Sequence, residues 1–558
     1  MDRNTIAAVV LCFIVLIGFQ TFFVNKNSST EEKKSSSQAL PKEESSMQSK
    51  EMEGGQAPTE NEFATIQKES PGLPTQRLDQ RLNIENDFFI AEISRLTGGV
   101  LSWKLKKYKN EKEDFIELMP AKLPEAGDSL NLESLLYVNQ KWETLYPFEI
   151  VSQSNEEIIL KYDGEAFSIT KSYHFNPEKY SVDLSISFVS KKKLEAARLA
   201  FVLRDHHVNE EAKGFLFFSD RKTPQRLLLM TQLGKMSSET LEGLQNGKEL
   251  LPVQGERVQW IGVDDQYFLK ALISHVPTQD SNEELGRASI DSNDSGVTAL
   301  LWYAAPQEST KEQSVMLSFF AGPKDLDILS AAHTNLSESV DYGWFRWIAL
   351  PLLSLLKLFY GFIHNYGIAI LLLTLFVKTV LYPLTHKSLK SAKEMQRIQP
   401  QMELIKKKYQ NNKETMNREI MQLMKSNKVN PLGGCFPMLL QLPVFIALYR
   451  VFGSSIELRG APFIFWIQDL SIKDPYFVTP LFTGVITFVQ QKMTPTTADA
   501  AQMKMMLYTM PLFMTAILLY LPSGLTLYIL CNTVLTIVQQ HLINRRFPQT
   551  VKASEKRP

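Results

Sequence analysis

Apolar and polar residues follow two different patterns along this chain of 558 residues. From about residue 77 to 333, apolar and polar positions alternate in short runs such as 157–162, 167–173 and 180–188, and clusters of Asn, Gly, Pro and Asp separate these runs. Half-buried strands joined by turns have this period of two. We therefore predict a large all-β sandwich domain over residues 77–335.

The second pattern consists of continuous apolar runs. A bilayer core of ~30 Å needs about 20 helical residues to cross it. The first such run, residues 6–24, ends without a small-residue cleavage site, so residues 1–24 are expected to be an uncleaved transmembrane anchor. Residues 25–76 are rich in Ser, Glu, Lys, Gln and Pro, and this composition predicts a disordered linker.

The other apolar runs predict an all-α transmembrane core of five helices. One helix is expected at 366–385, and transmembrane helices 3–6 are expected within 435–543. The last run is too long for one span, and its Pro-Ser-Gly sequence at 522–524 predicts a hairpin tip. Residues 341–362 mix Trp, Arg and Lys with apolar residues, which suits either a span or an interfacial helix.

The distribution of basic residues predicts the topology. Residues 386–430 hold eleven Lys or Arg against four Glu, so the positive-inside rule places them in the cytoplasm, together with the basic tail 544–558. Apolar residues at three- and four-residue spacings predict that 386–430 is a helical hairpin. The count then gives six spans with both termini cytoplasmic, a periplasmic β domain, and an interfacial amphipathic helix at 341–362. The basic face of the hairpin suits lipid headgroups or an acidic or RNA-bearing partner such as a ribosome equally well.

One cation, Lys378, interrupts the apolar run at 366–385. A Lys near the middle of a span costs about 2.5–3.5 kcal/mol on insertion scales, so it either reaches the interface or faces a polar interior. Thr374 and Tyr382 lie one turn away on the same helix face. Further polar residues at membrane depth in the later spans are Gln441, Thr483, Thr487, Asn532 and Thr536. None is acidic, and we therefore predict a polar groove around Lys378 that receives an acidic visitor.

Other chemistry has little support in the sequence. Cys12, Cys435 and Cys531 lie in or beside apolar runs and indicate neither a disulfide framework nor a zinc site. The sequence Asp-His-His at 205–207 has no further ligand at metal-binding spacing and is interpreted as a surface feature. No Gly-rich phosphate loop is present, so nucleotide hydrolysis is not predicted. We expect no cofactor, no metal and no enzymatic activity.

Four motifs resemble the YidC membrane-protein insertase family, in its Gram-negative form with a large periplasmic domain. The matching stretches are Asn430 to Phe445, Leu458 to Leu470, Gln490 to Pro495 and Leu521 to Tyr528. The β domain resembles the periplasmic domain of that family more loosely and is similar to a sugar-mutarotase-like sandwich. The resemblance implies an insertase and folding chaperone of the bacterial inner membrane. Its implied partners are nascent membrane proteins, the lipid bilayer, the ribosome and the secretion translocon, with no specific DNA.

The family resemblance also implies site residues. Lys378 occupies the position of the groove's positive residue, which is usually Arg, and Thr374 and Gln441 lie in the same groove. Tyr528 carries over as a groove residue, whereas Ile529 stands where some members have a second Tyr. With Asn532 added from the polar pattern, these residues form the predicted substrate groove.

Two alternatives from other classes stay open at this point. A secondary transporter would need internal repeats and intramembrane carboxylates, and the sequence shows neither. A carbohydrate-active enzyme on a membrane anchor would need paired carboxylates in a sugar cleft, which sequence alone cannot locate.

Overall fold

The alternating runs form strands as predicted. The computed structural model describes residues 81–546 apart from gaps, of which the longer ones are 120–129, 206–213, 247–256, 276–286, 305–311, 431–435 and 494–499. The expected anchor at 1–24, the linker at 25–76 and most of the basic tail lie outside the described residues. The chain divides into two units, one made of Met1–Glu210 and Lys222–Ser339 and the other of Glu211–Arg221 and Val340–Pro558.

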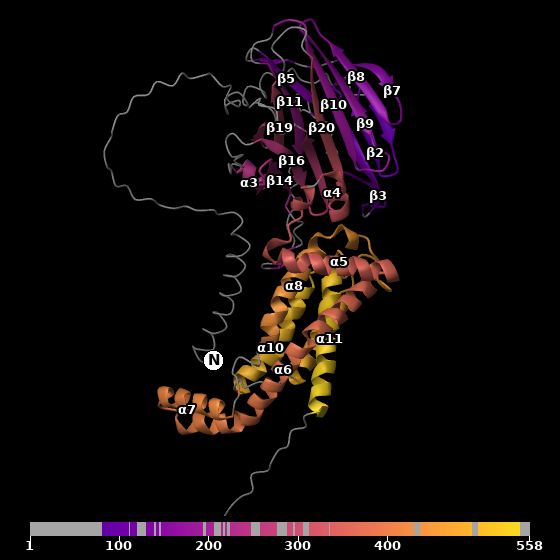
Figure 1. Cartoon of the computed structure of the whole chain (residues 1–558). Helices are drawn as coiled ribbons and strands as arrows, with labels where there is room; N and C mark the ends of the chain where they lie inside the picture. Colours follow the sequence, from indigo (N-terminus) through magenta and orange to yellow (C-terminus); the bar gives the residue numbers. More distant parts are fainter. Residues whose placement is uncertain are drawn as a thin grey trace, which may run out of the picture. The chain divides into compact units, whose positions relative to one another are not determined.

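The first unit is built on a large antiparallel sheet (Figure 1). In the order of their hydrogen bonding its strands are β15 (Met236–Thr240), β14 (Arg226–Thr231), β16 (Val258–Asp264), β17 (Phe268–Ser274), β20 (Glu312–Pro323), β10 (Ser181–Ser190), β9 (Phe167–Phe175), β8 (Glu157–Asp163) and β7 (Glu149–Gln153). Strands β8, β9 and β10 coincide with the three alternating runs, and their register places Ile158, Tyr173 and Leu184 side by side with almost no exposure. The alternation therefore marks the inward face, as a half-buried sheet requires.

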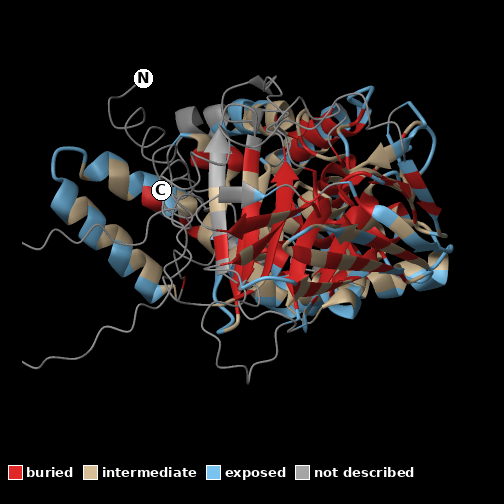
Figure 2. Cartoon of the chain, turned by 90° about the horizontal axis from the view of Figure 1, so that it is seen from above, coloured by how far each residue is buried: buried red, intermediate tan, exposed pale blue. Residues whose placement is uncertain are grey.

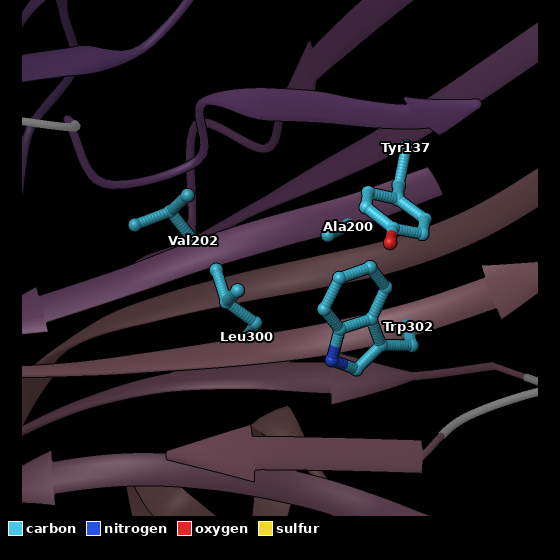
Figure 3. Packing of buried hydrophobic residues seen from close by; sticks show 5 residues of the cluster. All are labelled: Tyr137, Ala200, Val202, Leu300 and Trp302. Carbon is cyan, nitrogen blue, oxygen red and sulfur yellow. The ribbon is translucent and has the colours of Figure 1, made fainter. Parts of the chain in front are cut away.

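Smaller sheets complete this β-rich unit. One contains β18 (Arg287–Asn293), β19 (Gly296–Ala304), β11 (Arg198–Asp205), β5 (Ser134–Val138) and β6 (Lys141–Glu143). Another contains β1 (Arg81–Glu85), β2 (Phe89–Ser94), β3 (Val100–Lys109) and β4 (Phe115–Glu117). The short pair of β12 (Gly214–Phe215) and β13 (Phe218–Ser219) lies in the segment that is grouped with the second unit. Short helices α3 (Leu241–Gln245) and α4 (Leu326–Ala332) accompany the strands. Tyr137, Ala200, Val202, Leu300 and Trp302 form a buried cluster across neighbouring strands of the five-stranded sheet (Figure 3).

The Asp-His-His stretch falls partly outside the described residues. Asp205 is described and is buried, where its carboxylate lies 2.6 Å from the Lys270 ammonium in an ion pair between two strands. His206 and His207 are among the residues that the structure does not describe. Within the described part of the chain, no three His, Cys, Asp or Glu side chains gather closely enough to hold a metal ion.

A buried acid and a buried amine lie near one another inside the β domain. The Glu133 carboxylate accepts the Leu130 amide at 2.8 Å, and burial raises the pKa of Glu133 to about 7. The Lys171 ammonium donates to the carbonyls of Thr97 and Leu132 at 3.2 and 3.4 Å, and burial lowers the pKa of Lys171 to about 7. Both groups therefore change charge near neutral pH.

We expect the stability of the β domain to pass through a minimum near pH 7. The raised pKa of Glu133 stabilises the folded domain fully below pH ~4.5, and this stabilisation is lost as pH rises through 7. The lowered pKa of Lys171 stabilises the folded domain fully above pH ~10.5, and this stabilisation is lost as pH falls through 7. Calorimetry of the chain in detergent between pH 5 and 10 should show this minimum. Glu133→Gln should remove the acidic side of the curve and move the start of the alkaline side to lower pH, because the Glu133 charge raises the pKa of Lys171. A curve unchanged by Glu133→Gln would contradict the assignment.

The second unit is helical. Its elements are α5 (Arg346–Ile363), α6 (Tyr366–Lys408), α7 (Lys413–Ser426), α8 (Phe436–Ser454), α9 (Val478–Met493), α10 (Ala500–Leu518) and α11 (Ser523–Arg546) (Figure 1). Of the Pro-Ser-Gly sequence expected at the hairpin tip, Pro522 lies in the turn after α10, and Ser523 and Gly524 begin α11. Within this unit α11 packs against α6 and α9, α9 packs against α10, and α5 packs against α6 and α8.

The expected boundary at residue 385 is not a helix end. Helix α6 continues unbroken from the apolar run into the basic stretch and ends at Lys408, with Pro383 and Pro400 inside it. Its last part packs against α7 in an apolar cluster. Ile398, Met402 and Val429, which follows α7, are buried, and the partly buried residues around them are Met395, Ile420, Leu423 and Met424. The hairpin is thus present, but its first helix is the continuation of the span. Figure 2 shows the exposed residues along α7, in contrast to the buried strands.

By length and composition, three helices of the described region are apolar enough to cross a membrane. They are Gly343–Ile363, Tyr366–His386 and Ser523–Ile543, and Met506–Leu518 is a shorter apolar helix. Helix α5 is therefore long enough to cross a membrane. Its expected position along the membrane surface comes from the distribution of basic residues and not from its length.

Candidate functional site

Lys378 points into the helical unit. Asn365 caps the start of α6 by accepting the Ile368 amide, and Lys378 follows on the buried side of the helix. Its ammonium donates to the Thr536 hydroxyl of α11 at 2.8 Å. That hydroxyl donates in turn to the carbonyl of Asn532 at 2.7 Å, so its lone pairs are left to accept from the ammonium. Among the described residues Lys378 makes no ion pair.

The other predicted residues meet along the same face of α11. Thr374 is buried one turn before Lys378, where its hydroxyl donates to the Ile370 carbonyl at 2.7 Å and interacts with the Cys531 thiol. The Gln441 amide of α8 donates to the hydroxyl of Tyr528, which is 1% exposed.

Helices α6 and α11 are joined by a series of polar contacts, which we call the polar seam. Below Lys378, the Gln539 amide donates to the Thr385 hydroxyl at 2.8 Å, and the Lys393 ammonium donates to the Ile543 carbonyl at 3.3 Å. The α11 positions that make these bonds to α6 are 536, 539 and 543, a spacing of three and four residues that keeps them on one face. Tyr528 of α11 contacts α8 instead. Contact positions increase together along both helices, so α6 and α11 run parallel.

The structure brings together four of the five predicted residues through their side chains, namely Lys378, Thr374, Gln441 and Tyr528. The described hydrogen bond of Asn532 stays within α11, where its carbonyl accepts from the Thr536 hydroxyl. Tyr382, expected on the face of Lys378, is exposed and stacks on His386 instead. The sequence predicted Thr536 only as a polar residue at membrane depth and gave Cys531 no role in the groove. The spacing 528, 532, 536, 539 along an apolar helix was the signal that could have assigned Thr536 to the site.

Comparison with known proteins gives matches along the whole described chain. The family model of the YidC periplasmic domain matches residues 81–355, and that of the 60Kd inner membrane protein matches residues 358–550. A protein of Geotalea daltonii described as a membrane protein insertase YidC is 35% identical over 98% of this chain and 100% of its own length. The chain belongs to the YidC membrane-protein insertase family. A Geobacter metallireducens protein of the same description is 47% identical over about half of each chain.

Solved structures similar to this chain include a YidC insertase and a protein of a different description. An active YidC insertase crystal structure with the first transmembrane domain resolved is 18% identical, with a TM-score of 0.35, over 84% of this chain and 93% of its own. A putative aldose 1-epimerase of Escherichia coli K12 covers 44% of this chain with 8% identity and a TM-score of 0.30.

Proposed function

We propose that this chain inserts nascent membrane proteins into the bilayer and that Lys378 holds an acidic residue of the client's hydrophilic flank. The observation that carries the proposal is the environment of the ammonium. It is directed into the helical unit by a neutral hydroxyl, and in the described region no carboxylate neutralises it. An intramembrane cation kept in this way is a functional site by default.

The chemistry of the ammonium fits a transient carboxylate ligand. Lys378 carries three N–H donors, one of which is used by Thr536. The remaining donors can reach a client carboxylate without breaking the polar seam. A charge-assisted hydrogen bond is about twice as strong as a neutral one, so an acidic flank is bound in preference to a neutral polar flank. With the cell interior negative, moving each acidic charge outward then gains about 2.3 kcal/mol per 100 mV.

The helical unit supports the topology that this route requires. Because α6 and α11 run parallel, both start on the same side of the membrane, and the basic hairpin that follows α6 lies on the opposite side from the N-terminal ends of these helices. We propose a bacterial inner membrane protein with both termini cytoplasmic and the β domain periplasmic. The hairpin packs its apolar residues between α6 and α7, and its basic face would bind lipid headgroups, a ribosome or a secretion translocon.

Site-specific crosslinking tests the proposed client path. A photoreactive residue at position 378 is expected to crosslink to ribosome-stalled nascent chains whose acidic flank has reached the membrane. Position 380 is the matched control, because Val380 lies at nearly the same depth on the exposed side of the same helix. Equal crosslinking at 378 and 380 would show that clients pass along the lipid-exposed face and would remove the polar seam from the mechanism.

Thr536 gives a second test of the site. Thr536→Val keeps the shape of the side chain but cannot accept the ammonium, which can then extend toward the interface. A hydrogen bond to a charged group contributes about 1.5–3 kcal/mol, so we expect roughly a tenfold loss in insertion of acidic-tailed clients. Thr536→Ser should retain insertion. The measurement is translocation of the client tail into vesicles that contain the purified variant, and equal activity of the two variants would contradict the role of Thr536.

A further inference from the structure

The segment between α8 and α9, residues 455–477, is a folded element that we call the outer loop. Ile456, Leu458, Ile467 and Leu470 form its buried interior. The loop also bonds to itself, because the Phe463 amide donates to the Ile467 carbonyl and the Leu470 amide donates to the Ala461 carbonyl. It therefore presents its remaining side chains from a fixed backbone.

A buried carboxylate holds the second half of the outer loop in place. Asp474 accepts four hydrogen bonds of 2.7–3.1 Å, from the Trp466 indole, the Tyr476 amide, and the amide and hydroxyl of Thr479. Burial alone would raise the pKa of Asp474, but these hydrogen bonds hold that pKa below its ordinary value. The carboxylate thus stays ionised and ties the loop to the start of α9.

The outer loop exposes large apolar side chains in a disfavoured backbone conformation. Phe465 is 76% exposed and Tyr476 is 68% exposed, and Ile464, Ile472 and Phe477 are exposed as well. Phe465 and Phe477 have φ angles of 54° and 55°, and they are two of the five described non-glycine residues with positive φ. Positive φ is unusual for a bulky residue and is found where the surrounding structure enforces it for a purpose.

Exposed apolar residues continue along the chain from Tyr476 and Phe477 of the loop onto α9. Exposed apolar residues on α9 are Val478, Leu481, Phe482, Val485 and Val489. Their spacing of three and four residues is that of a lipid-facing helix side, and no acidic or basic residue occurs from Pro475 to Gln491. Aromatic residues at the end of such a side are typical of the level of the lipid headgroups.

We propose that the outer loop is a membrane-docking surface, which seats Phe465, Tyr476 and Phe477 in the outer-leaflet headgroup layer. Lipid is the occupant because Tyr476 and Phe477 directly precede the exposed, uncharged apolar side of α9. If the loop faced water, the rings of Phe465 and Phe477 would be exposed to it. Their positive φ angles would then be adopted more easily by glycine or a polar turn residue.

The docked loop would set the depth of the polar seam, and this consequence rests on the proposed function. The side-chain amide of Asn365 donates to the Phe463 carbonyl at 3.0 Å. A Cβ on Gly367 would lie 1.9 Å from the Phe463 ring, so the start of α6 packs directly on the loop. From Gly367 to Lys378 the helix rises about 16 Å at ~1.5 Å per residue. That distance is about half of a ~30 Å bilayer core and places the ammonium near the middle.

The loop also holds the start of α11. The amides of Ser523 and Gly524 donate to the carbonyls of Ile472 and Leu470, at 2.7 and 2.9 Å. Both helices of the polar seam are thereby fixed to the same lipid-contacting element.

Spin labels on the full chain in phosphatidylethanolamine–phosphatidylglycerol vesicles test the docking. In a background without the native cysteines, labels at positions 464 and 476 are expected to collide preferentially with oxygen. A label at Leu233, an exposed apolar residue in a turn of the β domain, should collide preferentially with a water-soluble nickel chelate. Nickel access at 464 and 476 equal to that at 233 would overturn the proposal. Nickel access that is lost only when a stalled client is bound would overturn it in favour of a protein occupant.

A glycine double variant separates the rings from the backbone. Phe465→Gly with Phe477→Gly preserves the two positive φ angles and removes only the rings. We expect nickel access of the label at 476 to rise several-fold, with an unchanged elution profile in detergent as the control for folding. Unchanged nickel access would show that the rings do not anchor the loop. Because collision with oxygen and nickel requires no insertion activity, this result is independent of whether the proposed function holds.

Discussion

Replacing Lys378 with glutamate is expected to reduce insertion of clients with an acidic translocated tail by about 100-fold or more. In the proposed mechanism the wild-type ammonium attracts the acidic flank with a charged hydrogen bond of about 1.5–3 kcal/mol, and the variant carboxylate would repel it. The change from attraction to repulsion therefore amounts to roughly twice the value of that bond, and each 1.4 kcal/mol is a factor of ten. The measurement is protease protection of the client tail in vesicles containing the purified chain.

Two further variants separate charge from shape at this position. Lys378→Arg keeps the positive charge and should retain most of the activity, although its planar group donates in a different geometry. Lys378→Met removes the charge at similar volume and should fall between the two. A client with a neutral tail should be affected far less by all three substitutions. Equal insertion of the acidic-tailed client by the Glu and Arg variants would remove Lys378 from the mechanism.

The β domain was predictable from its sequence because each strand carries its own signal. The alternating run at 167–173 became β9, whose apolar positions face inward, and the same holds for its neighbours β8 and β10. Alternation is a local consequence of burying one side of a sheet. The order of the nine strands is set by contacts between distant segments, such as β10 with β20, and no local pattern specifies it.

The continuation of α6 beyond residue 385 shows why composition misplaces a helix end. The change from apolar to basic residues marks where the solvent changes from lipid to water. The hydrogen bonds of a helix are satisfied within the helix, so its backbone has no need to stop at that boundary. The chain passes through Pro383 and ends only at Lys408, where basic residues in the last turn favour a C-terminus.

The seam was only partly predictable for a related reason. Lys378 stands out in an apolar run by its charge, whereas a single Thr in such a run is most often bonded to its own helix, as Thr483 is to Thr479. Thr536 makes that same local bond and additionally accepts from Lys378. Thr536 accepts from Lys378 only because α11 packs beside α6. The sequence of neither helix predicts that packing.

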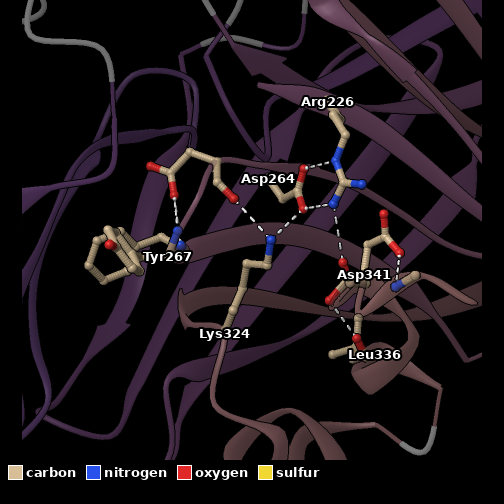
Figure 4. Close-up of polar contacts among 10 residues, drawn as sticks. Arg226, Asp264, Tyr267, Lys324, Leu336 and Asp341 are labelled. Atoms are coloured by element: carbon tan, nitrogen blue, oxygen red, sulfur yellow. Dashed lines mark hydrogen bonds and ion pairs between the residues drawn. The ribbon is translucent and has the colours of Figure 1, made fainter. Parts of the chain in front are cut away.

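Replacing Asp264 with alanine is expected to lower the free energy of unfolding of the β domain by about 3–5 kcal/mol. Asp264 is 2% exposed and neutralises two cations (Figure 4). The Arg226 guanidinium contacts both of its oxygens at 3.1 and 2.6 Å, and the buried Lys324 ammonium lies 2.7 Å from one of them. Without the carboxylate both positive charges would remain in the interior without their shared counterion.

The matched control for this variant is Glu85→Ala, which breaks the exposed ion pair with Lys106 and should change stability by no more than about 1 kcal/mol. Calorimetry of the chain in detergent measures both variants. Insertion by the Asp264→Ala chain should persist at temperatures where the β domain has melted, because the polar seam belongs wholly to the helical unit. Loss of insertion together with the β domain, while the helices stay folded, would show that the seam does not act alone and would favour an activity located in the sandwich.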